Sequence, residues 1–173
     1  MNESTGRKPV PILPDDNATL ARQLIADAGY ASLGTCLAAS HSNSGTLEGT
    51  GWPYTSLVQV ASDAAGSPIL LLSDLAAHSA NIAGNPQVSL LFDGTAGYED
   101  RLAGPRLTLL GQAATTTDPA IREQFLARHP KASLYAGFKD FRFYRVTMVA
   151  AHLVAGFGRI VWIEGEQLVT GAR

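Results

Sequence analysis

The segment Pro53–Phe92, PYTSLVQVASDAAGSPILLLSDLAAHSANIAGNPQVSLLF, holds the clearest structural pattern in the chain. It contains three short apolar stretches of strand length, at residues 54–61, 68–72 and 87–92. A Gly-containing hairpin turn at 63–66 separates the first two stretches, and a short helix at 75–83 separates the second from the third. Strands joined by such short connections indicate antiparallel β-structure.

The rest of the chain continues this pattern. Further strands are expected at 31–38, 106–114, 141–149 and 152–163. In the last of these, Gly156 and Gly158 allow a bulge or a bend. Helices are expected at 17–28 and from Asp118-Pro119 to Pro130, with a further turn at 134–138. The sequence therefore predicts a mainly β (α+β) fold, in which six to seven antiparallel strands form a barrel with peripheral helices.

An N-terminal arm and two loops are expected outside the predicted strands and helices. Residues 1–14 contain three prolines and no periodicity, so we expect a flexible N-terminal arm. A Gly/Ser/Asn-rich loop is expected at 40–52, and a polar loop at 93–104. The sequence shows no internal repeat and no sign of a second domain. Residues 15–173 are therefore expected to form a single domain.

Composition narrows the possible functions. Of 173 residues, 46% are hydrophobic and only 16% are charged, below the usual charged share of about 25%. Exposed apolar surface is therefore expected, and such surface often marks a subunit interface. The net charge is −2 without a basic run, so neither nucleic acid nor a membrane is an expected partner.

The sequence also gives expectations for the cellular compartment and for metal binding. The N-terminal sequence has no apolar signal-peptide core, so a cytoplasmic protein is the simplest expectation. The single cysteine, Cys36, excludes an internal disulfide and a cysteine-rich metal site. No spacing of histidines and carboxylates predicts a metal centre, and no catalytic acid, base or nucleophile can be named.

Small hydroxyl side chains gather where the strands of the central segment end. They are Thr55, Ser56, Ser73 and Ser79. A helix that begins near Ser73 would point free backbone N–H groups outward, an arrangement that suits a phosphate group.

Five segments taken together resemble a known family. They are PYTS, SDLAAHSAN, PRLTLLGQA, FRFYRV and VAGFG, in that order between Leu20 and Ile163. Their order and spacing resemble the pyridoxamine 5'-phosphate oxidase-like split barrels that bind flavin mononucleotide (FMN), and within them the branch of the haem-utilisation proteins. The resemblance implies a split barrel and a homodimer with FMN at the subunit interface.

The resemblance also implies a set of cofactor-binding residues. Ser56 and Leu57 match the strand whose backbone faces the flavin ring, and Ser73 matches the hydroxyl that ends the next strand. The phosphate-binding turn matches His78, Ser79 and Asn81. Arg106 matches a glutamine that contacts the flavin in the oxidases, and its guanidinium could bind a phosphate or the flavin carbonyls.

The sequence also departs from the family in three places. His78 and Ser79 stand where the oxidases carry Arg and Lys, and the Arg-x-His element of their substrate site is missing. The tail GEQLVTGAR has no histidine, whereas the haem-utilisation proteins ligate iron through one. His152 lies between apolar strands, where a packed or interface histidine is the first expectation.

These observations lead to one hypothesis and two alternatives. We expect an FMN-binding protein, a flavin-dependent oxidoreductase if it is an enzyme, with a small-molecule substrate that the sequence does not name. The first alternative is a haem-binding or haem-degrading protein. The second is a carrier of flavin without enzymatic activity.

Overall fold

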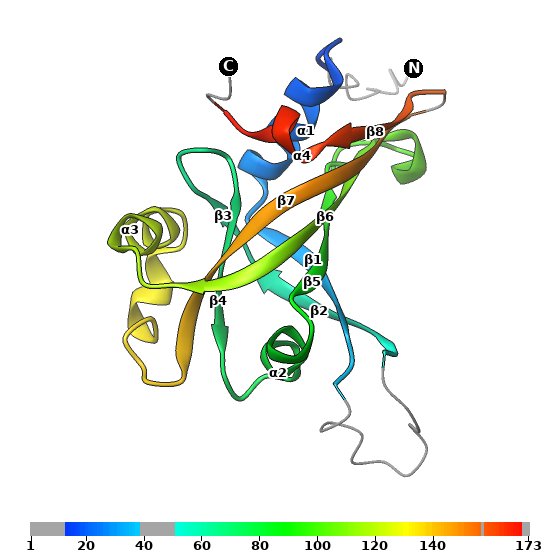
Figure 1. Ribbon diagram of the computed structural model, residues 1–173. Coiled ribbons are helices and arrows are strands. Elements are labelled where there is room, and N and C mark those ends of the chain that lie inside the picture. The colour runs from blue at the N-terminus through cyan, green and yellow to red at the C-terminus, as the bar shows by residue number, and fades with distance from the viewer. Residues whose placement is uncertain (1–12, 39–50, 157, 171–173) are drawn as a thin grey trace, which may run out of the picture.

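The fold is one antiparallel sheet of eight strands, shown in Figure 1. The computed structural model describes residues 13–38, 51–156 and 158–170. Its strands are β1 (Tyr30–Cys36), β2 (Pro53–Gln59), β3 (Ala61–Ser62), β4 (Pro68–Ser73), β5 (Gln87–Asp93), β6 (Pro105–Thr116), β7 (Phe141–Ala155) and β8 (Ile160–Glu164). Most of the predicted arm 1–14 and of the predicted loop 40–52 lies outside the described residues.

The topology forces the sheet to curl. Its strand order is β2-β1-β5-β6-β7-β4-β3, and β8 pairs with β7 beside this path. β2 and β3 lie at opposite ends of the path, yet only Val60 separates them along the chain. The sheet therefore bends until its two ends meet, which confirms the predicted α+β split-barrel class. The structure has more strands than expected because Val60 lies outside the β-ladder and so separates β2 from β3. Its backbone N–H donates instead to Gly29 O over 3.1 Å.

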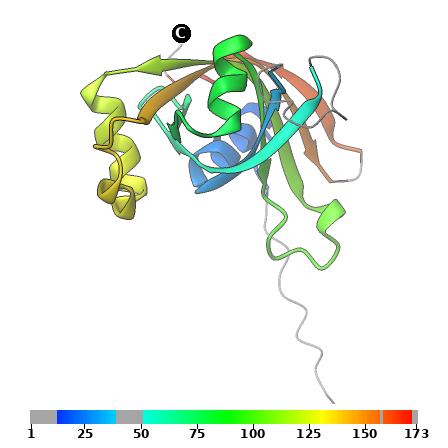
Figure 2. The same cartoon turned by 90° about the horizontal axis from the view of Figure 1, so that it is seen from below.

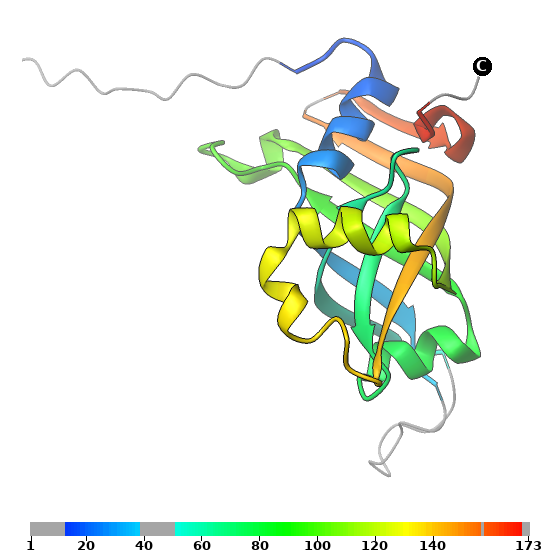
Figure 3. The same cartoon turned by 90° about the vertical axis from the view of Figure 1, so that its left-hand side faces the viewer.

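Within residues 13–38, 51–156 and 158–170, four α-helices lie around the barrel. They are α1 (Asn17–Asp27), α2 (Ala77–Gly84), α3 (Pro119–Arg128) and α4 (Gly165–Leu168). Two short 3₁₀ helices, η2 (Arg101–Ala103) and η3 (Pro130–Leu134), also occur in the described part of the chain. α1 and α4 lie together at one end of the barrel and α2 lies at the other, while α3 packs on one side, as Figures 1 and 3 show.

Side-chain caps explain where two predicted helices begin. The carboxylate of Asp16 accepts a hydrogen bond from the backbone N–H of Thr19 over 2.7 Å at the start of α1. At the start of α3, Asp118 accepts from Ala120 N over 2.9 Å, and Pro119 takes the first helical position.

Alternation along the strands builds the core. Every second residue of β5, namely Val88, Leu90 and Phe92, points into the barrel and is buried. α1 covers one end of this core with Leu20 and Ile25. A second, smaller cluster lies under α3, where Phe125 packs with Ile69, Leu71 and their neighbours.

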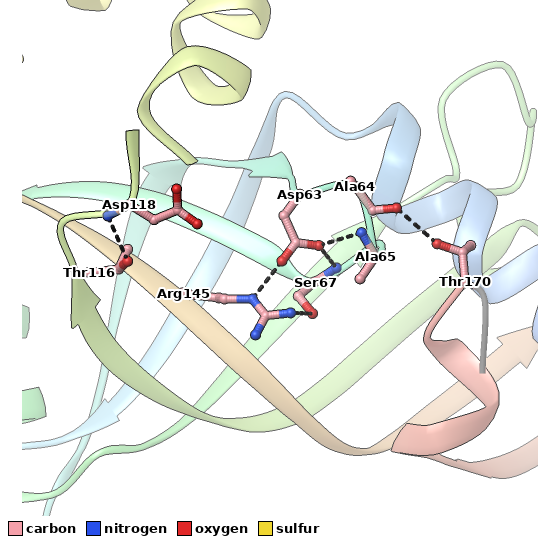
Figure 4. Close-up of polar contacts among 8 residues, drawn as sticks. All are labelled: Asp63, Ala64, Ala65, Ser67, Thr116, Asp118, Arg145 and Thr170. Carbon is pink, nitrogen blue, oxygen red and sulfur yellow. Dashed lines mark hydrogen bonds and ion pairs between the residues drawn. The ribbon is translucent and has the colours of Figure 1, made fainter. Parts of the chain in front are cut away.

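A buried carboxylate holds the hairpin between β3 and β4 to the rest of the sheet, as Figure 4 shows. Asp63 accepts hydrogen bonds from Ala65 N over 2.9 Å and Ser67 N over 2.8 Å. Its other oxygen accepts from Arg145 Nε of β7 over 2.5 Å, and Arg145 Nη2 lies 3.1 Å from Ser67 Oγ. The predicted turn at 63–66 is thus confirmed, and it is tied to a residue far along the chain.

The prediction for the last two strands was wrong. Residues 141–155 form one continuous strand, because β7 pairs with β6 along one edge and with β4 and then β8 along the other. Gly156 and Gly158 have φ of 99° and 81° and form the turn into β8, so they make no bulge within a strand. The register shift instead lies between Leu110 and Gly111, where Val149 is the extra residue of β7.

No helix among the described residues is long and apolar enough to span a membrane.

Candidate functional site

Five of the seven predicted cofactor-binding residues meet around the first turn of α2. Figure 2 looks onto this end of the barrel. Ser73 ends β4, and its hydroxyl accepts a hydrogen bond from Leu75 N over 3.2 Å. Ser79 Oγ donates to Ser73 O over 2.7 Å, and Ser56 Oγ of β2 lies 3.1 Å from His78 Nδ1. Asn81 follows one helical turn later.

Asn81 connects α2 to the end of β1. Its side chain is fully buried. Asn81 Nδ2 donates to Thr35 Oγ1 over 2.9 Å, and Asn81 Oδ1 accepts from Ala38 N over 2.8 Å. Because the amide already has a donor and an acceptor inside the protein, its contacts in this structure fix the helix in place.

Acidic side chains surround the turn that the resemblance assigns to a phosphate. Ser73 Oγ donates to Asp140 Oδ2 over 2.8 Å, and Asp74 N donates to Asp140 O over 2.5 Å. Arg142 Nε lies 2.8 and 2.9 Å from the two oxygens of Asp74. The hydrogen bond and the charge of Asp74 raise the pKa of Arg142. An incoming phosphate would meet two carboxylates, and the neighbouring guanidinium is already paired.

Burial also affects the charge of the titratable side chains at the turn. Desolvation lowers the pKa of His78 from its usual 6.5, so the imidazole is neutral at pH 7. Desolvation also raises the pKa of Tyr144, while a hydrogen bond with Ser79 opposes that rise. His78 therefore brings no positive charge to the place where the oxidases carry Arg and Lys.

Leu57 and Arg106 lie away from this cluster. α2 leads into β5 at Gln87, whereas Arg106 is paired with Asp93 at the far end of that strand. Leu57 points outward from β2 and is 75% exposed. Within one copy of the chain, these two residues do not join the other five. The cofactor-binding role of all seven residues stays a prediction.

Leu57 belongs to a wide apolar surface, which we call the outer sheet face. This surface is the outward side of β2, β1, β5, β6, β7 and β8. One row of paired residues crosses it in the order Leu57, Ser32, Leu91, Thr108, His152 and Trp162. The exposed apolar side chains of the face are Leu57, Leu91, Leu110, Val149, Ile160 and Trp162.

The outer sheet face contains an open groove of about 560 Å³. Residues of β1, β2, β5, β6 and β7 line it, among them Leu110 and Val149. Gly34 and its partner Ser89 both line the groove, and the Ser89 hydroxyl occupies the space over Gly34, where an added Cβ would lie 2.3 Å from Ser89 Oγ. Val149 is the extra residue of the β-bulge and has no partner on β6. Its side chain lines the groove.

Arg106 and His152 also lie on the outer sheet face. Arg106 is in the row next to His152, opposite Val154, and its Nη1 donates to Leu102 O over 2.8 Å and to Gly104 O over 3.3 Å. The His152 ring packs on Trp162 with centroids 4.8 Å apart. Composition predicted exposed apolar surface, but sequence reasoning did not locate it on this face, although Leu57 and Leu91 fall out of phase with the buried residues of their strands.

Sequence reasoning did not predict the polar contacts at this turn. The structure pairs Arg142 of β7 with Asp74. Nothing local signalled the hydrogen bond between Asp140 and Ser73, because 67 positions separate them. Among the described residues, no three His, Cys, Asp or Glu side chains gather as metal ligands would.

Comparisons with known proteins agree with this architecture. The family model described as CREG, beta-barrel matches residues 13–169. The chloroplastic heme oxygenase HOZ of Arabidopsis thaliana is 40% identical over 119 residues, which are 67% of this chain and 36% of that protein. The chain therefore spans about a third of the length of this curated relative.

Two solved structures extend the comparison. A heme binding protein from Mycobacterium smegmatis is 27% identical with a TM-score of 0.78, over 91% of this chain and 61% of that one. A protein of the pyridoxinephosphate oxidase family from Clostridium acetobutylicum is 14% identical with a TM-score of 0.60, over 87% of this chain and 96% of that one. The second likeness concerns the fold alone. The resemblance to oxidase-like split barrels and haem-utilisation proteins is thereby confirmed.

Proposed function

Because the chain belongs to the CREG β-barrel family, whose model matches residues 13–169, we propose that it binds haem on the outer sheet face. Two relatives whose names refer to haem support the proposal, one at 40% and one at 27% identity. The ligand class also agrees with the surface. Haem is a flat, largely apolar macrocycle with two carboxylates at one edge, and it needs a broad apolar support.

The groove on the outer sheet face carries the proposal. Its volume of about 560 Å³ lies within the range of roughly 300–1,000 Å³ found for small-molecule sites. The exposed Leu110 and Val149 line the groove beside Gly111. A planar ligand laid here would remove apolar surface from water, which is the main source of affinity for such a molecule.

Haem bound in this way would supply the chemistry of oxygen and electron transfer at its iron. The chain itself would bind and orient the ring and exclude water from one of its faces. Degradation of haem is a finer proposal that depends on this binding, and no acid or base on the outer sheet face is assigned to it.

FMN binding at the first turn of α2 is the second candidate. One observation favours it: among the described residues, no side chain caps the N-terminus of α2. The first N–H groups of a helix have no intrahelical acceptor and suit a phosphate. The carboxylates of Asp74 and Asp140 and the neutral His78 oppose it. An FMN-dependent oxidoreductase, as the sequence predicts, would need the phosphate to displace these internal contacts.

The homodimer expected from the resemblance belongs to the same proposal. The outer sheet face is wider than one haem, since its central row crosses six strands at about 4.8 Å per strand. A second copy that covers the rest of the face would close the groove around the ligand. This would place the exposed apolar side chains away from water.

Ligand titrations test the proposal directly. We expect saturable binding of haemin to the full chain, and FMN should bind no more tightly than riboflavin, which lacks the phosphate. Leu91→Asp places a charge on the outer sheet face and should weaken haemin binding at least tenfold. Leu134→Asp, on the exposed side of η3, is the matched control and should bind as wild type does. Tight FMN binding, more than tenfold over riboflavin, together with no saturable haemin binding would reverse the order of the two candidates.

A further inference from the structure

We propose that His152 ligates the iron of the bound haem and that Arg106 pairs with a haem carboxylate. This inference rests on the proposed function and assigns two residues of the outer sheet face to it. Haem iron in proteins is held by a small set of side chains, of which neutral imidazole is the commonest. Three of the four histidines of the chain, His78, His129 and His152, lie among the described residues.

The surroundings of the described histidines favour His152. His129 is buried, with Nε2 2.8 Å from Val60 O, and its ring packs against Phe125. The Nδ1 of His78 lies 3.1 Å from Ser56 Oγ inside the turn of α2. Neither ring nitrogen of His152 has a hydrogen-bond partner among the described residues. The residue is partly exposed on the outer sheet face, and its partner Thr108 lies two residues from Leu110, which lines the groove.

The sheet holds His152 in a fixed position. β7 is paired on both edges at this point, with Thr108 of β6 on one side and Trp162 of β8 on the other. The Trp162 ring lies 4.8 Å from the imidazole, between centroids, at an interplanar angle of 36°. A ligand side chain that is supported by a neighbouring ring and by a paired strand loses little freedom on binding.

Arg106 is placed to reach the edge of the same ligand. It lies one row from His152 on the adjacent strand β6, and diagonal neighbours of this kind are about 7–8 Å apart. Asp93, opposite Arg106 on β5, pairs instead with Arg101 and Thr95. The hydrogen bond from Thr95 and the nearby Arg101 lower the pKa of Asp93. Among the described residues, Arg106 donates only to the backbone carbonyls of Leu102 and Gly104, just before it in the chain. Its guanidinium can therefore turn to a carboxylate.

An absorption titration with haemin tests the iron ligand. Wild type and His78→Ala should give the same sharp Soret band and the same stoichiometry. His152→Ala should lose that band, and added imidazole should restore it by filling the vacated space, while circular dichroism confirms that the variant is folded. A wild-type Soret band in His152→Ala, or loss of the band in His78→Ala, would overturn the assignment.

A second titration tests the carboxylate partner. Arg106→Ala should weaken haemin binding by about 10- to 100-fold, the usual range for a hydrogen bond to a charged group. Its binding of haemin dimethyl ester should equal that of wild type, because the ester has no carboxylate. Arg122→Ala on the exposed side of α3 controls for the loss of one positive charge. Equal losses for haemin and its ester would overturn the role of Arg106.

The outcomes also separate this inference from the proposed function. If wild type shows no saturable haemin binding, the proposed function fails and the inference fails with it. If wild type binds haemin and Leu91→Asp does not, but His152→Ala keeps the full spectrum, the function stands and the ligand assignment alone is wrong.

Discussion

Replacing Asn81 by alanine distinguishes a structural role from the cofactor-binding role that the resemblance implies. The buried Asn81 side chain makes two hydrogen bonds, to Thr35 Oγ1 over 2.9 Å and from Ala38 N over 2.8 Å. Each contributes about 0.5–1.5 kcal/mol net. The buried Thr35 hydroxyl and the Ala38 N–H would also lose a partner, which brings the expected loss of unfolding free energy to about 2–4 kcal/mol.

The assay is thermal and urea unfolding of the ligand-free protein. For a domain of this size, 1 kcal/mol lowers Tm by about 2–4 °C, so Asn81→Ala should lower Tm by about 5–15 °C. Asn85→Ala is the matched control, because Asn85 accepts one exposed hydrogen bond from Gln87 N at the other end of α2. It should cost less than about 1 kcal/mol.

One result would refute this argument. If Asn81→Ala keeps the wild-type Tm within about 2 °C but weakens FMN binding more than tenfold, Asn81 contacts the ligand as the resemblance predicted. Loss of stability together with wild-type haemin affinity would support the structural role.

Three further predictions follow from the same structure. Gly34→Ala puts a Cβ 2.3 Å from Ser89 Oγ and should lower the free energy of unfolding in urea by about 1–3 kcal/mol. Ser89→Gly in the same chain should restore most of that free energy. Additive effects of the two changes would contradict the clash. The pKa of His78 is lowered by burial, so its NMR titration midpoint should lie below 6.5. The unfolded chain then binds the proton more readily, stability rises with pH between the lowered pKa and 6.5, and His78→Gln should flatten that rise. A midpoint at or above 6.5 would contradict the role of desolvation. Light scattering at micromolar concentration should give twice 18.2 kDa, and a monomer over that range would disprove the homodimer.

The sequence by itself determined the elements whose causes are local. The alternation of Val88, Leu90 and Phe92 predicted a strand and its buried side, because side chains of a strand point alternately to its two faces. Asp118-Pro119 predicted the start of α3, because a cap and a first-turn proline act within one helical turn. The α+β split-barrel class followed from many such local signals and from the family resemblance.

Some residues permit two local conformations, and the sequence alone could not decide between them. Gly156 and Gly158 marked a place of unusual backbone conformation, but a glycine permits a bulge and a turn alike. The pairing of β7 with β8 decided for a turn. Val60 likewise continued an apolar strand in the sequence, and only the closure of the barrel took it out of the ladder.

The arrangement of the candidate sites was decided by the tertiary structure alone. Asp140 meets Ser73 across 67 positions, and His152 joins a row with Leu57, Leu91 and Trp162 only when six strands pair in register. Such contacts depend on which strands become neighbours, which no short window of residues specifies. The sequence could therefore name serines, a histidine and an arginine suited to a cofactor. Sheet register separated the polar turn of α2 from the apolar outer face, because a side chain's position on a sheet is set by its partners on other strands.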